Sequence, residues 1–90
     1  MTVCKRVYYS GQVQGVGFRY TAQRLAANFP VAGYVRNLPD GRVELVTEGD
    51  AAEIDRLLRA ITEQMEGRIK KRTDFDSPPT GEFGNFSIRH

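Results

Sequence analysis

The sequence contains few of the residues that build disulfides, metal sites and membrane spans. Its 90 residues include one cysteine, one histidine and no tryptophan. Cys4 has no partner within the chain for a disulfide, and one cysteine with one histidine falls short of the three or four ligands of a zinc site. No apolar run approaches the roughly 20 residues that span a bilayer, and the N-terminal residues lack the apolar stretch of a signal peptide. We therefore expect a cytosolic protein with no metal and no membrane association, in which the thiol of Cys4 stays reduced.

An excess of charge of one sign is also missing. Thirteen basic and eleven acidic residues give a formal net charge of +2, which is too small to make nucleic acid the default partner. The chain is 40% hydrophobic and 27% charged, as is typical of a soluble globular protein, and its length suffices for one hydrophobic core but not for two. We expect a single domain over residues 1–90 that is a monomer and does not bind nucleic acid.

Short runs with apolar residues at alternate positions predict five β-strands. The runs are Val3 to Val13, Val31 to Asn37, Arg42 to Glu48, Arg68 to Phe75, and Phe83 to Ile88. The turn sequence Leu38-Pro39-Asp40-Gly41 predicts that the second and third strands form an antiparallel hairpin. The fourth run is basic and offers only Ile69, Thr73 and Phe75 to an inward face, so we expect it at the edge of the sheet.

Two apolar stripes at helical spacing predict two amphipathic helices. The first stripe consists of Phe18, Ala22, Leu25, Ala26 and Phe29, and it ends before Pro30 because a proline disfavours the α conformation in the preceding residue. The second consists of Ile54, Leu57, Leu58, Ile61 and Met65, between a capping-box-like pair, Asp50 and Glu53, and Gly67. The order β-α-β-β-α-β with a short extra C-terminal strand predicts an α+β, ferredoxin-like sandwich, in which both helices cover one face of an antiparallel sheet. This fold serves many unrelated functions and does not by itself predict one.

A glycine-containing segment between the first strand and the first helix is the strongest candidate for a functional site. It reads Gly11-Gln12-Val13-Gln14-Gly15-Val16-Gly17-Phe18-Arg19. Closely spaced glycines allow several backbone N–H groups to point into one concavity, and the helix N-terminus adds free N–H groups and a positive dipole end. Arg19 gains nothing from that dipole, whereas a bound phosphate would explain a guanidinium at this position. The alternative is a tight strand-to-helix turn with an exposed arginine.

Three other residues deserve a functional interpretation beside a structural one. Asn37 closes the second strand and could orient a water molecule, because its amide donates and accepts without ionising; the alternative is a hydrogen-bonded turn amide. His90, the last residue, is expected to be a solvated terminus rather than part of a catalytic triad. Cys4 is expected to be a small strand residue, because neither a histidine nor a helix N-terminus lies beside it to activate the thiol.

Three segments carry a resemblance to the acylphosphatase family. They are Val13-Gln14-Gly15-Val16-Gly17-Phe18-Arg19; then Gly33-Tyr34-Val35-Arg36-Asn37, with Asp40-Gly41 and Val43-Glu44 after it; and finally Asn85-Phe86-Ser87-Ile88-Arg89. The resemblance covers nearly the whole chain, in the order and spacing of that family. It implies the βαββαβ fold predicted above and hydrolysis of the carboxyl-phosphate bond of acyl phosphates.

The resemblance also implies roles for individual residues. Arg19 resembles the phosphate-binding arginine and Asn37 the water-orienting asparagine. The amide cradle would be the loop Gln14, Gly15, Val16, Gly17, Phe18 and Arg19. The implied partner is a small acyl phosphate, with inorganic phosphate as product and competitive inhibitor, and no cofactor is implied.

The chain departs from the family pattern at three places. Gln12 stands where an arginine is common, Ala22 where a threonine is frequent, and Phe29-Pro30-Val31 where Leu-Gly-Leu is frequent. The first two could weaken support for the site, and the third affects only the exit from the helix. None of them removes a residue with a direct role.

Two rival classes of function remain open at this stage. A βαββαβ domain with basic residues at Arg68, Lys70, Lys71 and Arg72 could bind RNA, although the aromatic RNA-recognition signature is missing from the strands expected at the centre. A regulatory domain that binds small anions without turning them over would have the same cradle. Turnover separates the enzyme from that binding domain, and salt-dependent oligonucleotide binding would reveal the RNA-binding module.

Overall fold

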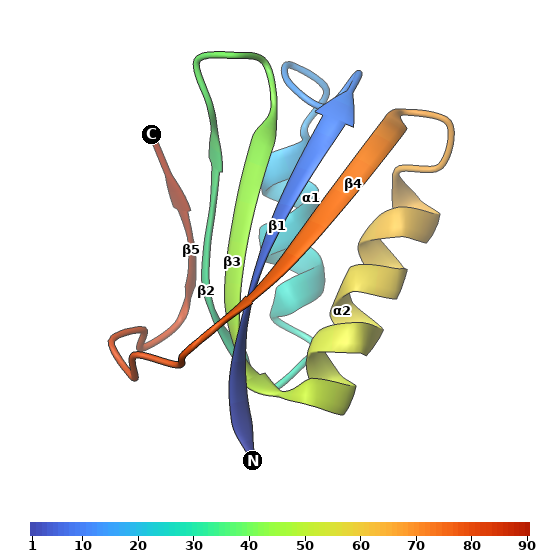
Figure 1. Cartoon of the computed structure of the whole chain (residues 1–90). Helices are drawn as coiled ribbons and strands as arrows, with labels where there is room; N and C mark the ends of the chain where they lie inside the picture. The colour runs from blue at the N-terminus through green and yellow to red at the C-terminus, as the bar shows by residue number, and fades with distance from the viewer.

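The computed structural model describes residues 1–90 and contains two helices and five strands (Figure 1). In chain order these are β1 (Thr2–Gly11), α1 (Phe18–Ala26), β2 (Val31–Asn37), β3 (Val43–Asp50), α2 (Ala51–Gln64), β4 (Ile69–Ser77) and β5 (Phe86–Arg89). The predicted order of elements is confirmed, and most predicted boundaries lie within a few residues of the observed ones. The structure is the ferredoxin-like α+β fold that the sequence pattern predicts.

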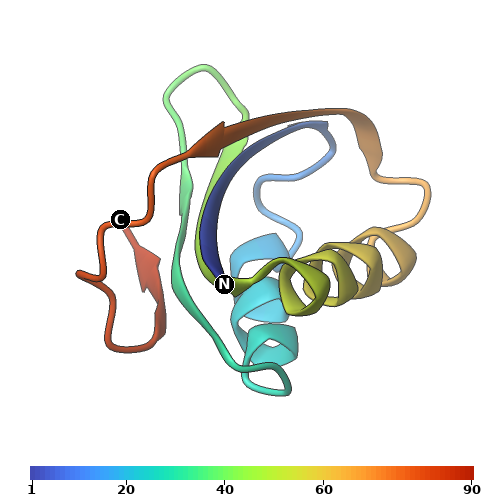
Figure 2. The same ribbon diagram turned by 60° about the horizontal axis from the view of Figure 1, so that its bottom comes forward.

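The five strands form one sheet in the order β4-β1-β3-β2-β5. Three of the four strand pairs are antiparallel, but β5 pairs in parallel with β2, so the sheet is mixed at that edge. The segment between β4 and β5 crosses from one edge of the sheet to the other before β5 begins (Figure 2). Because β1, β2 and β5 run in the same direction, their C-terminal ends meet at one edge of the molecule.

The core lies between the sheet and the two helices, which cover the same face of the sheet (Figure 2). Its fourteen buried residues come from β1, β2, β3 and both helices, with one from the loop before α1 and one directly after α2: Val7, Tyr9, Val13, Phe18, Ala22, Ala26, Val35, Val43, Leu45, Ile54, Leu57, Leu58, Ile61 and Met65. Every member of the second predicted stripe is buried. From the first stripe Leu25 and Phe29 are only partly buried, although both still pack against the core.

The edge strand β4 differs from the sequence expectation in the direction of two side chains. It is at the edge, as predicted, and Ile69 packs against the core. Phe75, expected to face inward, is 52% exposed and packs edge-on against Tyr8, with ring centroids 5.8 Å apart. Thr73 pairs with Tyr8 and shares its face. The cause is a register shift beside Ser10 and Gly11, because an extra residue in one strand reverses which face the following side chains occupy.

The start of α2 also differs from its prediction. Asp50 is the N-cap residue, but its side chain makes no capping hydrogen bond and instead accepts one from the N-terminal amine of Met1 at 3.4 Å. The capping box predicted for Asp50 and Glu53 is therefore not formed. Glu53 instead pairs with Arg56 one turn further on, at 2.8 Å.

Candidate active site

A cleft of about 400 Å³ lies where β1, β2 and β5 end and α1 begins. Its lining comes from α1, from the ends of β2 and β5, and from the loop between β1 and α1: Val13, Gly15, Gly17, Phe18, Arg19, Tyr20, Gln23, Asn37, Ile88 and His90. The structure thus brings Arg19 and Asn37 together although 18 positions separate them in the sequence. Four of the six predicted loop residues line the same cleft, and Gln14 and Val16 do not.

The loop before α1 presents backbone N–H groups without partners in the protein. Gly15 and Gly17 have φ values of 75° and 78°, a left-handed conformation that residues with a side chain rarely adopt. From Gly15 to Tyr20 no backbone amide donates to a backbone acceptor, and the next amide, that of Thr21, donates to Gly17 at 2.9 Å. A helix leaves its first amides free in this way, and such a concave group of amides with the positive end of the helix dipole suits an anion.

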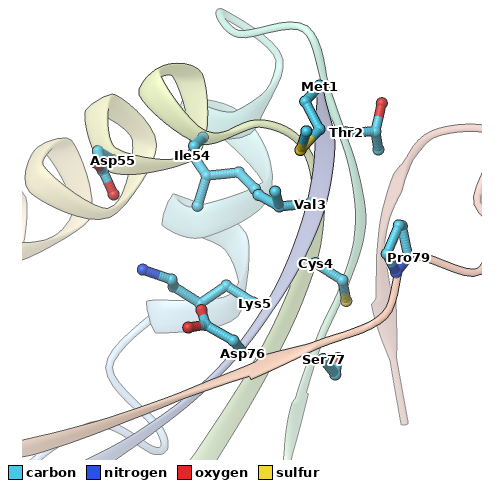
Figure 3. A pocket seen from close by; sticks show the side chains of 11 residues that line it. Met1, Thr2, Val3, Cys4, Lys5, Ile54, Asp55, Asp76, Ser77 and Pro79 are labelled. Carbon is cyan, nitrogen blue, oxygen red and sulfur yellow. The ribbon is translucent and has the colours of Figure 1, made fainter.

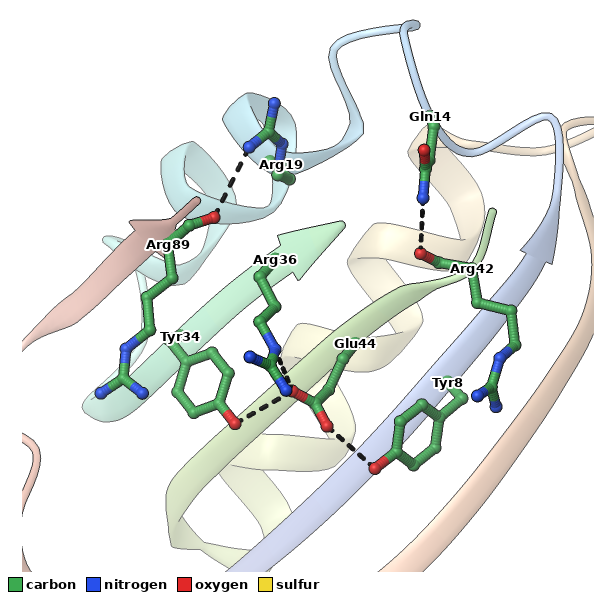
Figure 4. Close-up of polar contacts among 8 residues, drawn as sticks. All are labelled: Tyr8, Gln14, Arg19, Tyr34, Arg36, Arg42, Glu44 and Arg89. Carbon is green, nitrogen blue, oxygen red and sulfur yellow. Dashed lines mark hydrogen bonds and ion pairs between the residues drawn. The ribbon is translucent and has the colours of Figure 1, made fainter. Parts of the chain in front are cut away.

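Two contacts hold this loop in place. The side-chain amide of Gln14 donates to the carbonyl oxygens of Leu38 and Arg42, both at 2.8 Å, which ties the loop to the turn between β2 and β3 (Figure 4). The Phe18 ring lies 4.9 Å from the ring of Tyr9 in the core, centroid to centroid. Gln14 therefore belongs to the loop as an anchor, since its side chain is directed away from the cleft.

The guanidinium of Arg19 contacts the end of β5 and no carboxylate. Its Nη1 lies 3.5 Å from the carbonyl oxygen of Arg89 (Figure 4). The same Nη1 lies 3.3 Å from Nδ1 of His90. Because an arginine nitrogen can only donate, Nδ1 of His90 is the acceptor, and a neutral ring then carries its proton on Nε2. No acidic side chain of the protein forms an ion pair with Arg19. Its positive charge remains available to an anion in the cleft.

Asn37 ends β2 and leaves a buried oxygen without a partner. Its Oδ1 is inaccessible to solvent and accepts no hydrogen bond. The neighbouring turn is closed by backbone bonds instead, from Leu38 to Arg42 at 2.8 Å and from Gly41 to Leu38 at 3.1 Å. The turn-amide interpretation of Asn37 therefore does not account for this oxygen. The side-chain oxygens of Tyr9, Thr47 and Ser77 are likewise buried without a partner, but of these four residues only Asn37 lines the cleft.

Three residues of the cleft were missed or misjudged from the sequence. His90 is exposed, as expected of a terminus, but it lies against Arg19 because β5 runs parallel to β2 and ends beside it. Tyr20 and Gln23 also line the cleft. Gln23 lies four residues after Arg19 and three after Tyr20, so a helix places it beside both, and this spacing could have identified it.

A second polar cluster lies on the face of the sheet that no helix covers. The carboxylate of Glu44 accepts hydrogen bonds from Tyr8 at 2.9 Å, Tyr34 at 3.0 Å and Arg36 at 2.7 Å (Figure 4). Burial acts to raise the pKa of Glu44, but these hydrogen bonds outweigh it and hold the pKa below its ordinary value. The cluster joins β1, β2 and β3 behind the cleft and supports the strand that ends in Asn37.

A separate hollow, of about 480 Å³, lies at the other end of β1, between the start of α2 and the end of β4 (Figure 3). It includes Cys4, a free thiol that is 2% exposed, as expected of a strand residue. Lys5, Asp55 and Asp76 are its charged side chains. No group of three or more His, Cys, Asp or Glu side chains suited to a metal occurs in the structure. Neither helix has the length and apolar character needed to cross a membrane.

The fold and the cleft define a small α+β domain with an anion site at the end of its sheet, and comparison with known proteins specifies the class further. Residues 5–88 match the family model Acylphosphatase. The chain is 44% identical to the acylphosphatase of Methylococcus capsulatus over 87 residues, which covers 93% of this chain and 95% of that one. It is 38% identical to the acylphosphatase of Acaryochloris marina over 86 residues, which covers 96% and 92% of the two chains.

Solved structures agree with these relatives. The crystal structure of acylphosphatase from Bacillus subtilis superimposes with a TM-score of 0.89 at 32% identity and covers all of both chains. The chain belongs to the acylphosphatase family. It is an acylphosphatase enzyme.

Proposed function

We propose that this enzyme hydrolyses the carboxyl-phosphate bond of small acyl phosphates to a carboxylate and inorganic phosphate, without a metal or organic cofactor. Arg19 and the amides of the Gln14–Arg19 loop hold the phosphoryl group, and Asn37 orients the attacking water. The observation that carries the proposal is the placement of Asn37 and the unpaired guanidinium of Arg19 in one cleft, beside the free amides of the loop.

The phosphoryl group is bound by charge and by directed N–H groups. The guanidinium of Arg19 offers a planar pair of donors that matches two phosphoryl oxygens. The free amides between Gly15 and Tyr20 can donate to the remaining oxygens. Because these groups are already in place, they stabilise charge that develops on the oxygens in the transition state without rearranging.

Asn37 orients the attacking water and contributes no charge. Its Nδ2 is not buried and has no partner in the protein, so it can donate a hydrogen bond to a water molecule, which keeps its second lone pair free to attack the phosphorus in line with the breaking bond. The leaving carboxylate is stable without protonation, so no general acid is needed, and a phosphoryl oxygen takes the proton from the water. His90 is not assigned as a base, because its Nδ1 lies 3.3 Å from the guanidinium of Arg19, which can only donate.

The other partner expectations remain part of the proposal. Inorganic phosphate, which fits the same cradle as the phosphoryl group, would be a competitive inhibitor. We expect the enzyme to be a cytosolic monomer that does not bind nucleic acid. Of the basic edge that suggested RNA, Arg72 is engaged by Asp74 through two hydrogen bonds of 2.8 Å.

Phosphate release from benzoyl phosphate, compared with release from phenyl phosphate, tests this proposal. Phenyl phosphate has the same ring but a poorer leaving group, so we expect rapid turnover of benzoyl phosphate alone and competitive inhibition by inorganic phosphate. Equal rates on both substrates would show a general phosphatase. Binding of phosphate without turnover of either substrate would favour the regulatory anion-binding domain.

A further inference from the structure

The catalytic cleft adjoins a second hollow along helix α1. This hollow, of about 590 Å³, shares Tyr20 and Gln23 with the cleft. It continues between the C-terminal half of α1 and the start of β5, and we call it the α1–β5 groove. Its apolar lining is Tyr20, Ala26, Ala27, Phe29, Val31 and Phe86.

The groove offers apolar surface to solvent although the core is complete beneath it. Tyr20 is 74% exposed, and Ala27 is also exposed. Phe29 and Phe86 pack against the core on one side but are only partly buried. Among the polar residues of the groove, Arg24 and Asn85 are exposed and Gln23 is partly buried. An apolar strip of this kind, leading out of a polar cleft, suits a ligand with one anionic end and one apolar end.

The direction of the groove follows from helix geometry. Tyr20, Gln23 and Ala27 are spaced by three and four residues and therefore form one row along α1. The row is about 10 Å long at 1.5 Å per residue, the length of an extended acyl chain of about eight carbons. The row begins next to Arg19, where the phosphoryl group is expected.

The geometry of the reaction places the acyl group on this side of the cleft. In an in-line displacement the leaving carboxylate lies opposite the attacking water. Asn37, which orients the water, belongs to the end of β2, whereas Tyr20 and Gln23 belong to α1. A phosphoryl group held between them therefore directs its acyl substituent toward α1 and the groove.

We propose that the α1–β5 groove is the acyl subsite of this enzyme and that its preferred substrates are monocarboxylic acyl phosphates with an apolar chain of up to about eight carbons. This inference rests on the proposed function, because it takes the phosphoryl position from Arg19 and Asn37. The chain lies along Tyr20 and Ala27, and Phe29 and Phe86 form the wall of the groove. Since the groove is open on one side, each added methylene is expected to raise kcat/KM by about 2- to 4-fold, and the rise ends when the chain passes Ala27.

A chain-length series tests the subsite directly. Hydrolysis of acetyl, butyryl, hexanoyl, octanoyl and decanoyl phosphate by the unmodified enzyme should become more efficient up to octanoyl phosphate and then level off. The ratio of kcat/KM for octanoyl phosphate to that for acetyl phosphate should fall about 10-fold or more in Tyr20→Ala, and also in Ala27→Glu, which places a charge on the path of the chain. Phe75→Ala, which removes an exposed aromatic ring from the opposite face, is the matched control and should leave the ratio unchanged.

The outcomes separate this inference from the proposed function. Hydrolysis of acetyl phosphate with no dependence on chain length, or with the same dependence in Tyr20→Ala, would overturn the acyl subsite alone. No hydrolysis of any acyl phosphate would overturn the proposed function as well. Succinyl phosphate adds a third arm: if it were preferred over butyryl phosphate, and Arg24→Gln removed that preference, the groove would serve an anionic acyl group and the apolar assignment would be wrong.

Discussion

Replacement of Asn37 by alanine should impair catalysis while leaving the fold as stable as before, or more stable. The structure gives the reason, because Oδ1 of Asn37 is buried and accepts no hydrogen bond within the protein. Loss of one positioned hydrogen-bonding group from an active site lowers kcat by about 10²–10³-fold. The same change removes a buried acceptor whose burial costs about 1–3 kcal/mol. We therefore expect the free energy of unfolding to stay unchanged or to rise by up to about 1 kcal/mol, which corresponds to about 4–8 °C in Tm.

The assay measures three quantities for Asn37→Ala: kcat with benzoyl phosphate, the inhibition constant of inorganic phosphate, and Tm. The inhibition constant should be nearly unchanged, because Asn37 is assigned to the water and not to the phosphoryl group. Asn28→Ala, which changes an exposed asparagine in the turn after α1, is the control and should alter none of the three. The reasoning would be refuted by a variant that melts earlier but keeps its kcat. An inhibition constant that rises as much as kcat falls would move Asn37 into the phosphate cradle.

Three further predictions concern the anion site, the sheet and the core. Arg19→Ala should lose both turnover and phosphate binding but keep the Tm of the unmodified protein. Arg19→Lys should restore little of either, because lysine lacks the planar pair of donors. A folded Arg19→Ala enzyme with near-normal kcat/KM would show that Arg19 does not belong to the site. Glu44→Gln should melt earlier than the unmodified protein at pH 7. Folding lowers the pKa of the Glu44 carboxyl, so the ionised side chain stabilises the folded protein. This stabilisation is complete above the pKa of the unfolded chain, about 4.3, and is lost as the pH falls through the pKa of the folded protein. The difference in Tm should therefore close in acid, and a constant difference from pH 7 to pH 3 would contradict the assignment. Leu58 is 2% exposed, so Leu58→Ala should leave a cavity and lower the free energy of unfolding by about 2–5 kcal/mol, as measured by urea denaturation. An unchanged urea midpoint would contradict the place of Leu58 in the core.

Local patterns were sufficient to predict the elements of this fold. The stripe from Ile54 to Met65 and the alternation in the first three strands reflect periodicities that a chain with one core must satisfy. Two features escaped prediction because they depend on how strands pair. The register shift beside Gly11 turns Phe75 outward, and the parallel pairing of β5 with β2 is set by a connection that crosses the molecule.

The candidate site was predictable in its residue types but not in its geometry. The glycines of the loop and the position of Arg19 indicate an anion cradle from local chemistry alone. No property of the sequence indicates that His90 contacts Arg19, because this contact requires β5 to end beside the start of α1. The unpartnered oxygen of Asn37 is likewise a fact of burial, which only the assembled structure reveals.

The pH dependence of kcat with benzoyl phosphate, measured in excess EDTA, tests most directly whether the enzyme works without a metal or a general base. Arginine stays protonated and asparagine does not ionise between roughly pH 5 and 8, so kcat should be nearly flat over this range and unaffected by the chelator. Any slope should follow the ionisation of the substrate's own phosphate. The account would be contradicted by activity that is lost in EDTA and restored by a divalent ion. It would be contradicted equally by a bell-shaped profile that disappears in His90→Gln, because His90 would then act as the base.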